Sequence, residues 1–345
     1  MERELWQYLK TVKKPIVLYG MGNGADKIIK VLERYCIGFD GVFASDGFVR
    51  DKLFYGYKVT SYQNLKEKFG DMIVLLCFGS ERPEVLENVR KIALEQELYA
   101  PEVPVIGEGL FDKSYVEKNK SGFEKIYSLL ADEKSRQTFK NIIKFKLSGK
   151  IEYLFDCQVE KDEPYESFLK LNENESFLDL GAYNGDTVSD FIERVPNYSK
   201  IIAVEPDVKS YKKLIKNTET LRDIYCHNVC ISNFSGMGNF GMRAGRNSGV
   251  SESGSQTVFT TVDDLLKNSS VGFIKMDVEG EEKKAIEGAV NTISQHKPKM
   301  LISCYHRTED LISIPNTVFS IRNDYKLYIR HFPSLPAWDT AYFFV

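Results

Sequence analysis

Three apolar runs, each followed by an amphipathic stretch, open the chain. They cover residues 15–20, 37–45 and 71–80. Residues 26–35 and 62–69, which lie between these runs, carry apolar positions at helical spacing. Strands and helices in regular alternation are typical of a parallel sheet. We therefore predict a small Rossmann-like α/β domain over residues 1–108.

The pattern changes in the middle of the chain and then restarts. Residues 109–170 have a helical period with many charges and no strand signal, which predicts a helical connector. Residues 171–345 again alternate apolar runs with amphipathic stretches. These strand candidates lie at residues 176–180, 200–205, 223–232, 271–277 and 299–305.

The last two apolar runs, residues 325–332 and 341–345, are joined by the short link PSLPAWDT. Such a link suits an antiparallel pair better than a crossover. We therefore predict an α/β fold with a mostly parallel Rossmann-like sheet and an antiparallel terminal hairpin. Between the third and fourth of these strands, residues 236–260 hold two β-like pieces around a Gly/Ser-rich centre, which is either a lid or a slack loop.

Composition narrows the class of partner. A chain of 345 residues is too long for one ordinary core, and its net charge of −3 gives no support for a nucleic-acid or acidic-membrane partner. No apolar stretch is long enough to span a bilayer, and we expect a cytoplasmic protein. Four lysines in residues 209–216 suit a solvated helix face. The segment CHNVC (226–230) reads as a strand, which would point its histidine away from both cysteines, so we predict no metal there.

A first glycine turn, GMGNGA, follows the first predicted strand. Gly20, Gly22 and Ala25 fit the spacing of a dinucleotide-binding turn, and Asp46 ends the second strand, where it could receive a ribose hydroxyl. This turn either binds a nucleotide or nucleotide sugar, or uses its glycines for packing alone. We favour packing, since no convincing catalytic group follows in this half.

A second glycine turn, DLGAYNGDT, has a different chemistry. Gly181 and Gly185 allow close backbone approach, but the third glycine of the dinucleotide pattern is missing. Asp179 precedes the turn, where a carboxylate suits a cationic or amine-bearing ligand. Glu205, at the end of the next strand, offers two acceptor oxygens to a ribose diol. Together these residues suggest a nucleoside with a positive group and no phosphates, and S-adenosylmethionine fits.

Residues 170–345 resemble the FkbM family of methyltransferases, which has the class I S-adenosylmethionine-dependent fold. FLDLGAYNGDTV and IIAVEPDVKSYKKL are similar to the first two motifs of the family, and FIKMDVEGEEKKAIEGA resembles its K-x-D-x-E-G-x-E block. Tyr183-Asn184 stands where many members carry Asn and then an apolar residue. The N-terminal half resembles Rossmann-like modules associated with nucleotide sugars.

The resemblance implies which residues hold S-adenosylmethionine. The backbone of Gly181, Tyr183, Asn184 and Gly185 would approach its methionine part, with Asp179 near the ammonium group. Glu205 would hold the ribose. Ser232 or Asn233 would lie near the adenine, and Asp277 would complete the site.

Candidate catalytic groups follow two later strands. Asp277 and Glu279 come after the fourth strand, and Tyr305 and His306 after the fifth. Ligands of open α/β sheets bind beyond these carboxyl ends. His306 is a candidate general base, although a structural histidine is an equal reading. Asp277 and Glu279 are expected on one side of their turn, to orient the substrate or act as a base, and we predict no metal.

Two weaker assignments accompany these catalytic candidates. Lys275, inside the fourth strand, is expected to orient a carboxylate. His331 is a second, weaker candidate for the base.

We therefore predict an S-adenosylmethionine-dependent O-methyltransferase acting on a hydroxyl of a sugar, glycan or secondary metabolite. Its partner would be a small molecule or glycan, including a nucleotide-linked sugar. One alternative is a nucleotide-sugar-binding module with a degenerate methyltransferase half. Another is a nicotinamide-dependent oxidoreductase using the first glycine turn, which lacks a nearby Tyr-x-x-x-Lys or comparable group.

Overall fold

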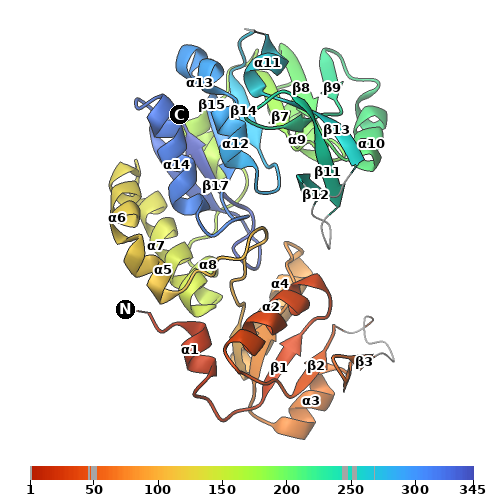
Figure 1. Ribbon diagram of the computed structural model, residues 1–345, viewed down its shortest axis with the longest axis vertical. Coiled ribbons are helices and arrows are strands. Elements are labelled where there is room, and N and C mark those ends of the chain that lie inside the picture. Colours follow the sequence, from red (N-terminus) through yellow and green to blue (C-terminus); the bar gives the residue numbers. More distant parts are fainter. Residues whose placement is uncertain (1, 46, 48–52, 243–247, 251–254, 268) are drawn as a thin grey trace.

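The computed structural model describes every residue except 1, 46, 48–52, 243–247, 251–254 and 268. Two α/β units lie one above the other, and a set of helices runs along one side of the molecule (Figure 1). Among the described residues, no helix has the length and apolar character needed to cross a membrane. Asp46 and most of the Gly/Ser-rich centre of residues 236–260 lie outside the described part.

The N-terminal unit is built on a four-stranded parallel sheet of order β2-β1-β5-β6. The predicted strands at residues 15–20, 37–45 and 71–80 are confirmed, whereas β6 was not predicted, because three residues after a helix give no periodic signal. The strands are β1 (Ile16–Tyr19), β2 (Gly41–Phe43), β5 (Ile73–Leu76) and β6 (Glu97–Tyr99), with a small hairpin of β3 (Leu53–Phe54) and β4 (Tyr57–Lys58).

Helices cover both faces of this sheet, so β1 is buried on both sides. Leu18 packs toward α1 and α2, whereas Tyr19 faces α4. Ser61 caps the N-terminus of α3 by accepting a hydrogen bond from the backbone of Asn64. The helices are α1 (Leu5–Leu9), α2 (Asn23–Arg34), α3 (Tyr62–Phe69) and α4 (Pro83–Glu95).

Helices link the two units, as the charged helical pattern predicts. Asp132 caps the longest of them, α7, and Gly149 ends it in the left-handed conformation. Asp132 also pairs with Arg330 of the second sheet, which fixes the linking helices to that sheet. The helices are α5 (Lys113–Lys118), α6 (Lys120–Leu129), α7 (Glu133–Ser148), α8 (Glu152–Phe155) and the π-helix η1 (Tyr165–Leu169).

The C-terminal unit contains a seven-stranded sheet of order β16-β17-β15-β14-β7-β8-β9. All neighbouring pairs are parallel except those made by β17, which runs antiparallel to β15 and β16. The predicted terminal hairpin is therefore confirmed. The strands are β7 (Ser176–Leu180), β8 (Lys200–Val204), β9 (Ile224–His227), β14 (Phe273–Met276), β15 (Lys299–Ser303), β16 (Leu327–His331) and β17 (Thr340–Phe344).

Helices sandwich this sheet. α9 (Asp186–Arg194) and α10 (Val208–Thr218) cover one face. The other face packs against α11 (Val262–Leu266), α12 (Glu282–Glu287), α13 (Val290–His296) and α14 (Asp310–Ile321). The four lysines of residues 209–216 are exposed along α10, as predicted.

One predicted strand, residues 223–232, is divided. Its second part pairs in parallel with β13 (Ser255–Thr260) of a separate mixed sheet, which includes both β-like pieces expected in residues 236–260. This sheet comprises β10 (Cys230–Ile231), β11 (Gly236–Met242), β12 (Ser248–Val250) and β13.

The two units meet near the carboxyl ends of their parallel strands. Ser80, which follows β5, exchanges two backbone hydrogen bonds of 2.8 and 3.0 Å with Leu335, in the link between β16 and β17. The backbone N–H of Ile106 donates to the carbonyl of His306, which follows β15. The loops that carry the candidate site residues therefore lie next to the N-terminal unit.

Candidate active site

The second glycine turn and Glu205 come together in space. The backbone N–H of Tyr183 donates to Oε2 of Glu205 at 2.9 Å, and the N–H of Asp207 donates to Oε1 at 2.8 Å. The turn and Glu205 lie close together because the adjacent parallel strands β7 and β8 end at the same edge of the sheet. Burial raises the pKa of Glu205 to about 7, although its two backbone hydrogen bonds act in the opposite direction.

Glycine is required at the first position of this turn for two reasons. Gly181 has φ of +87°, and a Cβ atom there would lie 1.9 Å from the carbonyl oxygen of Asp277. The turn is thus packed directly against the backbone that carries a candidate catalytic carboxylate. Gly185, with φ of +90°, is the N-cap of α9, so the turn ends at a helix N-terminus.

Asp179 is held by neighbouring side chains below the turn. Its carboxylate is fully buried, accepts a hydrogen bond from the hydroxyl of Thr187, and lies 3.3 Å from Nζ of Lys275. The same Nζ reaches the carbonyl of Gly181. In this arrangement Asp179 supports the turn from below, and its place near the donor ammonium, directly or through water, stays a prediction. The expectation that Lys275 orients a carboxylate is confirmed.

The remaining predicted donor-binding residues divide into two sets. Tyr183 is half exposed and has φ of +46°, and the carbonyl of Asn184 accepts a hydrogen bond from Asn217. Both residues border the Glu205 carboxylate. Ser232, in contrast, is buried after β10, and its hydrogen bonds within the described residues go to Thr260 and Asn233 rather than to the turn.

The turn after β14 presents two carboxylates to one imidazole nitrogen. Nε2 of His306 lies 3.5 Å from Oδ1 of Asp277 and 3.6 Å from Oε2 of Glu279. Glu279 adopts a left-handed conformation with φ of +53°, followed by Gly280 at +86°. This backbone directs both side chains to the same side, as expected from their spacing.

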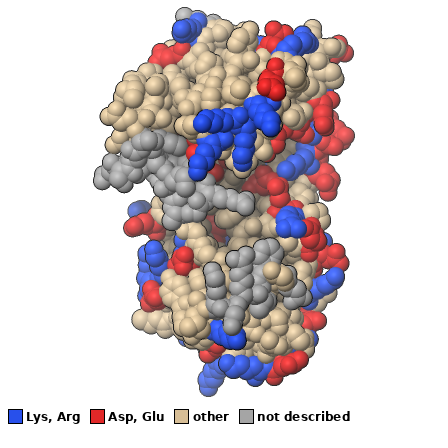
Figure 2. Space-filling view, turned by 90° about the vertical axis from the view of Figure 1, so that its right-hand side faces the viewer, with Lys and Arg blue, Asp and Glu red and all other residues tan. Residues whose placement is uncertain are grey.

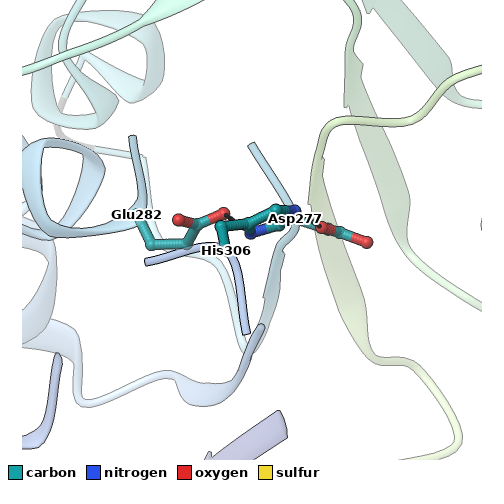
Figure 3. Close-up of side chains that lie close together, drawn as sticks. All are labelled: Asp277, Glu282 and His306. Atoms are coloured by element: carbon teal, nitrogen blue, oxygen red, sulfur yellow. Dashed lines mark ion pairs between the residues drawn. The ribbon is translucent and has the colours of Figure 1, made fainter. Parts of the chain in front are cut away.

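Three carboxylates surround His306, which favours its structural reading over the predicted role as general base. The ring lies between Glu282 and Asp277 (Figure 3), and Nδ1 is 3.0 Å from Oε1 of Glu282. Burial alone would lower the pKa of His306, but Glu282, Asp277 and Glu279 outweigh burial and raise it to about 10. A ring already protonated at neutral pH cannot accept a proton from a substrate.

Glu282 was not identified from the sequence, yet it organises this corner of the site. Its side chain is fully buried, and Oε1 also accepts hydrogen bonds from the backbone of Val278 and Gly280. In the sequence it looks like one more charge at the start of a helix. Its role depends on its contact with His306, which lies 24 residues later in the chain. No local pattern in the sequence indicates such a contact.

Asp277, Glu282 and His306 offer ligand atoms within 4.8 Å of one another, which raises the question of a metal ion. The imidazole, however, separates the two carboxylates, because Glu282 meets Nδ1 and Asp277 meets Nε2. The two carboxylates therefore lie on opposite sides of the ring, and the absence of a metal stays a prediction.

Packing accounts for Gly20, Gly24 and His331, whereas Gly22 has φ of +136° and no atom within 4 Å of an added Cβ, so both readings of the first glycine turn stay open. A Cβ atom at Gly20 would lie 2.6 Å from the ring of Phe78, and one at Gly24 would lie 2.2 Å from the carbonyl of Cys77. His331 is fully buried beside Thr340, and burial lowers its pKa to about 3. Neither feature supplies a catalytic group.

Comparisons with known proteins agree with this geometry. Residues 179–323 match the family model of the methyltransferase FkbM domain. The solved methyltransferase FkbM from Methylobacillus flagellatus KT superposes with a TM-score of 0.73 and 22% sequence identity, over 96% of this chain and 90% of that one. No curated protein matches the chain.

Two further solved structures match about half of the chain. Fibrillarin from Aeropyrum pernix, in complex with S-adenosyl-L-methionine, has a TM-score of 0.33 and 14% identity, over 50% of this chain and 67% of its own. Precorrin-6y C5,15-methyltransferase from Geobacter metallireducens GS-15 has a TM-score of 0.34 and 10% identity, over 51% of this chain and 81% of its own.

The fold class is established by the sheet order and by the match over almost the whole chain. A mostly parallel seven-stranded sheet with one antiparallel strand, together with the superposition at a TM-score of 0.73, gives a class I methyltransferase fold. Family and fold together support a methyltransferase, and the family implies S-adenosylmethionine as its methyl donor. Residues 179–323 of this chain are a domain of the methyltransferase FkbM family.

Proposed function

We propose that the protein is an S-adenosylmethionine-dependent O-methyltransferase that acts on a hydroxyl of a sugar, glycan or secondary metabolite. The observation that carries this proposal is the 2.9 Å hydrogen bond between Tyr183 and Glu205. It joins a glycine turn to an acidic side chain, and the same turn touches the backbone of Asp277. A nucleoside site and a pair of carboxylates thus lie side by side.

The residues of the turn fit the donor. The open backbone at Gly181 and Gly185 suits close approach of the methionine part, and an ionised Glu205 can accept hydrogen bonds from a ribose diol. When bound, the donor supplies a methyl group on a positively charged sulfur, and its transfer to oxygen breaks the carbon–sulfur bond and releases the hydroxyl proton.

Asp277 is the proposed proton acceptor. Its Oδ1 accepts a hydrogen bond from the hydroxyl of Tyr305 at 3.3 Å and faces His306, whereas no described residue hydrogen-bonds to Oδ2. The side chain is partly exposed, so Oδ2 can meet an incoming hydroxyl. Positioning of acceptor and base supplies most of what such a displacement needs. Glu279 is proposed to hold the acceptor through a second hydrogen bond.

The organisation of the chain follows from this assignment. We assign residues 171–345 as the methyltransferase domain, residues 109–170 as the helical connector and residues 1–108 as an accessory Rossmann-like domain. The packing reasons for Gly20 and Gly24 favour an accessory domain that does not need a nucleotide in its glycine turn.

The direct test is incubation with methyl-labelled S-adenosylmethionine and a panel of sugars, nucleotide sugars and glycans, followed by mass analysis. The proposal expects a gain of one methyl group on the oxygen of one acceptor class. Binding of nucleotide sugars without binding of S-adenosylmethionine would instead favour a nucleotide-sugar-binding module.

A further inference from the structure

We propose that the acceptor is a neutral sugar that stacks on the indole ring of Trp338, where the N-terminal unit meets the methyltransferase domain. This inference rests on the proposed function and names its acceptor site. Trp338 lies in the link between β16 and β17, the segment PSLPAWDT, to which the sequence had assigned only a connecting role.

The position of Trp338 follows from the sheet. Because β17 is antiparallel to β15, the start of β17 lies beside the end of β15, and the N–H of Cys304 donates to the carbonyl of Thr340. Asp339 is close enough to Asp277 for the two charges to interact, which contributes, after burial, to a raised pKa of Asp339. Trp338, directly before Asp339, therefore lies at the same edge of the sheet as Asp277.

Contacts from both halves of the chain hold the indole in place. A Cβ atom at Gly79 would lie 2.1 Å from Cζ3 and 2.3 Å from Cε3 of Trp338, so the edge of the six-membered ring rests on the Gly79 backbone. The adjoining residues Ser80 and Leu335 exchange two backbone hydrogen bonds. The hydroxyl of Ser334 donates to the carbonyl of Trp338. The side chain is thus fixed before any ligand binds, which lowers the entropic cost of binding.

The indole nevertheless remains available to a ligand. Trp338 is 37% exposed, and among the described residues no other ring stacks on it and no acceptor receives its indole N–H. The molecular surface is hollowed between the two halves, and acidic side chains lie in that hollow (Figure 2). An exposed aromatic ring that is rigidly held by the protein marks a binding surface.

The chemistry of this site suits a sugar. The carbon–hydrogen face of a pyranose packs on an aromatic ring, while carboxylates accept hydrogen bonds from its hydroxyl groups. Asp277, Glu279 and Asp339 supply such carboxylates at this edge of the sheet, with Asp339 also 3.7 Å from Nζ of Lys161. The same arrangement disfavours an acceptor that presents a carboxylate or phosphate at this position, because like charges repel.

The test uses Trp338 as its own probe. The chain has two tryptophans, and the other, Trp6, is buried. In a Trp6→Phe variant, Trp338 becomes the only indole emitter. Titration with neutral methyl glycosides of glucose, galactose, mannose, fucose and rhamnose is expected to shift its emission and to reduce its quenching by acrylamide at least about twofold for one of them. If this variant is unstable, the difference between wild type and Trp338→Leu gives the same signal.

Gly79 provides a second, independent variant. Gly79→Ala keeps the tryptophan but drives a methyl group into its ring, so the affinity for the responding glycoside should fall at least about tenfold. Gly38 is exposed, with no atom within 4 Å of an added Cβ, so Gly38→Ala is the matched control and should keep wild-type affinity. In the double variant Gly79→Ala/Trp338→Leu, affinity should be no lower than in Trp338→Leu alone.

The failure of this inference can be told apart from the failure of the proposed function. Calorimetry with S-adenosylhomocysteine on the same proteins reports the donor site alone. Intact donor binding with no response of Trp338 to any glycoside, or with glycoside affinity unchanged in Gly79→Ala, overturns the Trp338 site and leaves methyl transfer standing. Absence of donor binding in the wild type overturns the proposed function itself.

Discussion

Nδ1 of His306 lies 3.0 Å from Oε1 of Glu282, and both side chains are almost completely buried. The pair places a fixed positive charge beneath Asp277 and Glu279, which both approach the opposite nitrogen of the ring. We therefore propose that the histidine is a positioning residue, which keeps two neighbouring carboxylates close together despite their mutual repulsion.

The ion pair between His306 and Glu282 makes stability depend on pH. The pKa of His306 is raised from 6.5 to about 10 on folding, so the stabilisation is complete below pH 6.5 and is lost as pH rises toward 10. In that window the free energy of unfolding should fall by up to about 1.4 kcal/mol per pH unit. Glu282→Gln should reduce this slope, as measured by urea unfolding at several pH values.

An exposed histidine provides the control for this experiment. His296, at the end of α13, is exposed, and His296→Asn should keep the wild-type slope. Identical slopes in the wild type and in Glu282→Gln would contradict the assignment of a buried imidazolium.

Replacement of Glu205 should damage donor binding without unfolding the protein. Glu205→Ala removes the proposed ribose acceptor and the partner of the Tyr183 N–H, so affinity for S-adenosylhomocysteine should fall at least about 100-fold, or roughly 2.7 kcal/mol. Glu193→Ala, on the exposed side of α9, is the matched control. Calorimetry measures both, and unchanged affinity in Glu205→Ala would refute the ribose assignment.

The raised pKa of Glu205 predicts the pH dependence of the same binding. With a pKa of about 7, the carboxylate is mainly protonated at pH 6 and mainly ionised at pH 8. The ionised form accepts stronger hydrogen bonds, so affinity for S-adenosylhomocysteine should rise by up to about tenfold over this range. Glu205→Gln should bind weakly with no such rise, and calorimetry at the two pH values distinguishes the cases.

Asp277 and Glu279 should differ in their effect on turnover. Asp277→Asn removes the proposed proton acceptor, and kcat should fall at least about 100-fold while affinity for S-adenosylhomocysteine changes by less than about threefold. Glu279→Gln should mainly raise the KM of the acceptor. Steady-state kinetics with labelled donor measures both variants, and wild-type turnover in Asp277→Asn would remove this residue from the mechanism.

Arg330 should be the main electrostatic link between the helical connector and the sheet. Its guanidinium is buried and lies 2.7 Å from Asp132 and 2.8 Å from Glu163. Arg330→Met should lower the free energy of unfolding by about 3 kcal/mol, because both carboxylates lose their partner. Lys134→Met removes an exposed partner of Glu163 and should cost less than about 1 kcal/mol. Equal losses in urea unfolding would contradict this ranking.

Local pattern was sufficient for most of the fold and for the meeting of the second glycine turn with Glu205. The helix over residues 62–69 has both its apolar spacing and its Ser61 cap in the sequence, and the short link between the last two apolar runs indicates the terminal hairpin. The proximity of Gly181 and Glu205 could be predicted from the sequence, because adjacent parallel strands end at the same edge of a sheet.

The rest depended on contacts between residues distant in sequence. Asp179 looked like a ligand-binding carboxylate, but its burial against Lys275 and Thr187 emerges only in the folded chain. Glu282 and Trp338 lie in segments that read as a helix start and a connecting link. Their partners, His306 and Gly79, come from other parts of the fold, so neither pairing has a sequence period that could reveal it.

The most direct test of the account is a crystal structure of the protein soaked with S-adenosylhomocysteine. The account predicts electron density for this ligand between residues 181–185 and Glu205, with the ribose hydroxyls within hydrogen-bond distance of the Glu205 carboxylate. A ligand bound elsewhere, or no ligand at a concentration that saturates other class I methyltransferases, would contradict it.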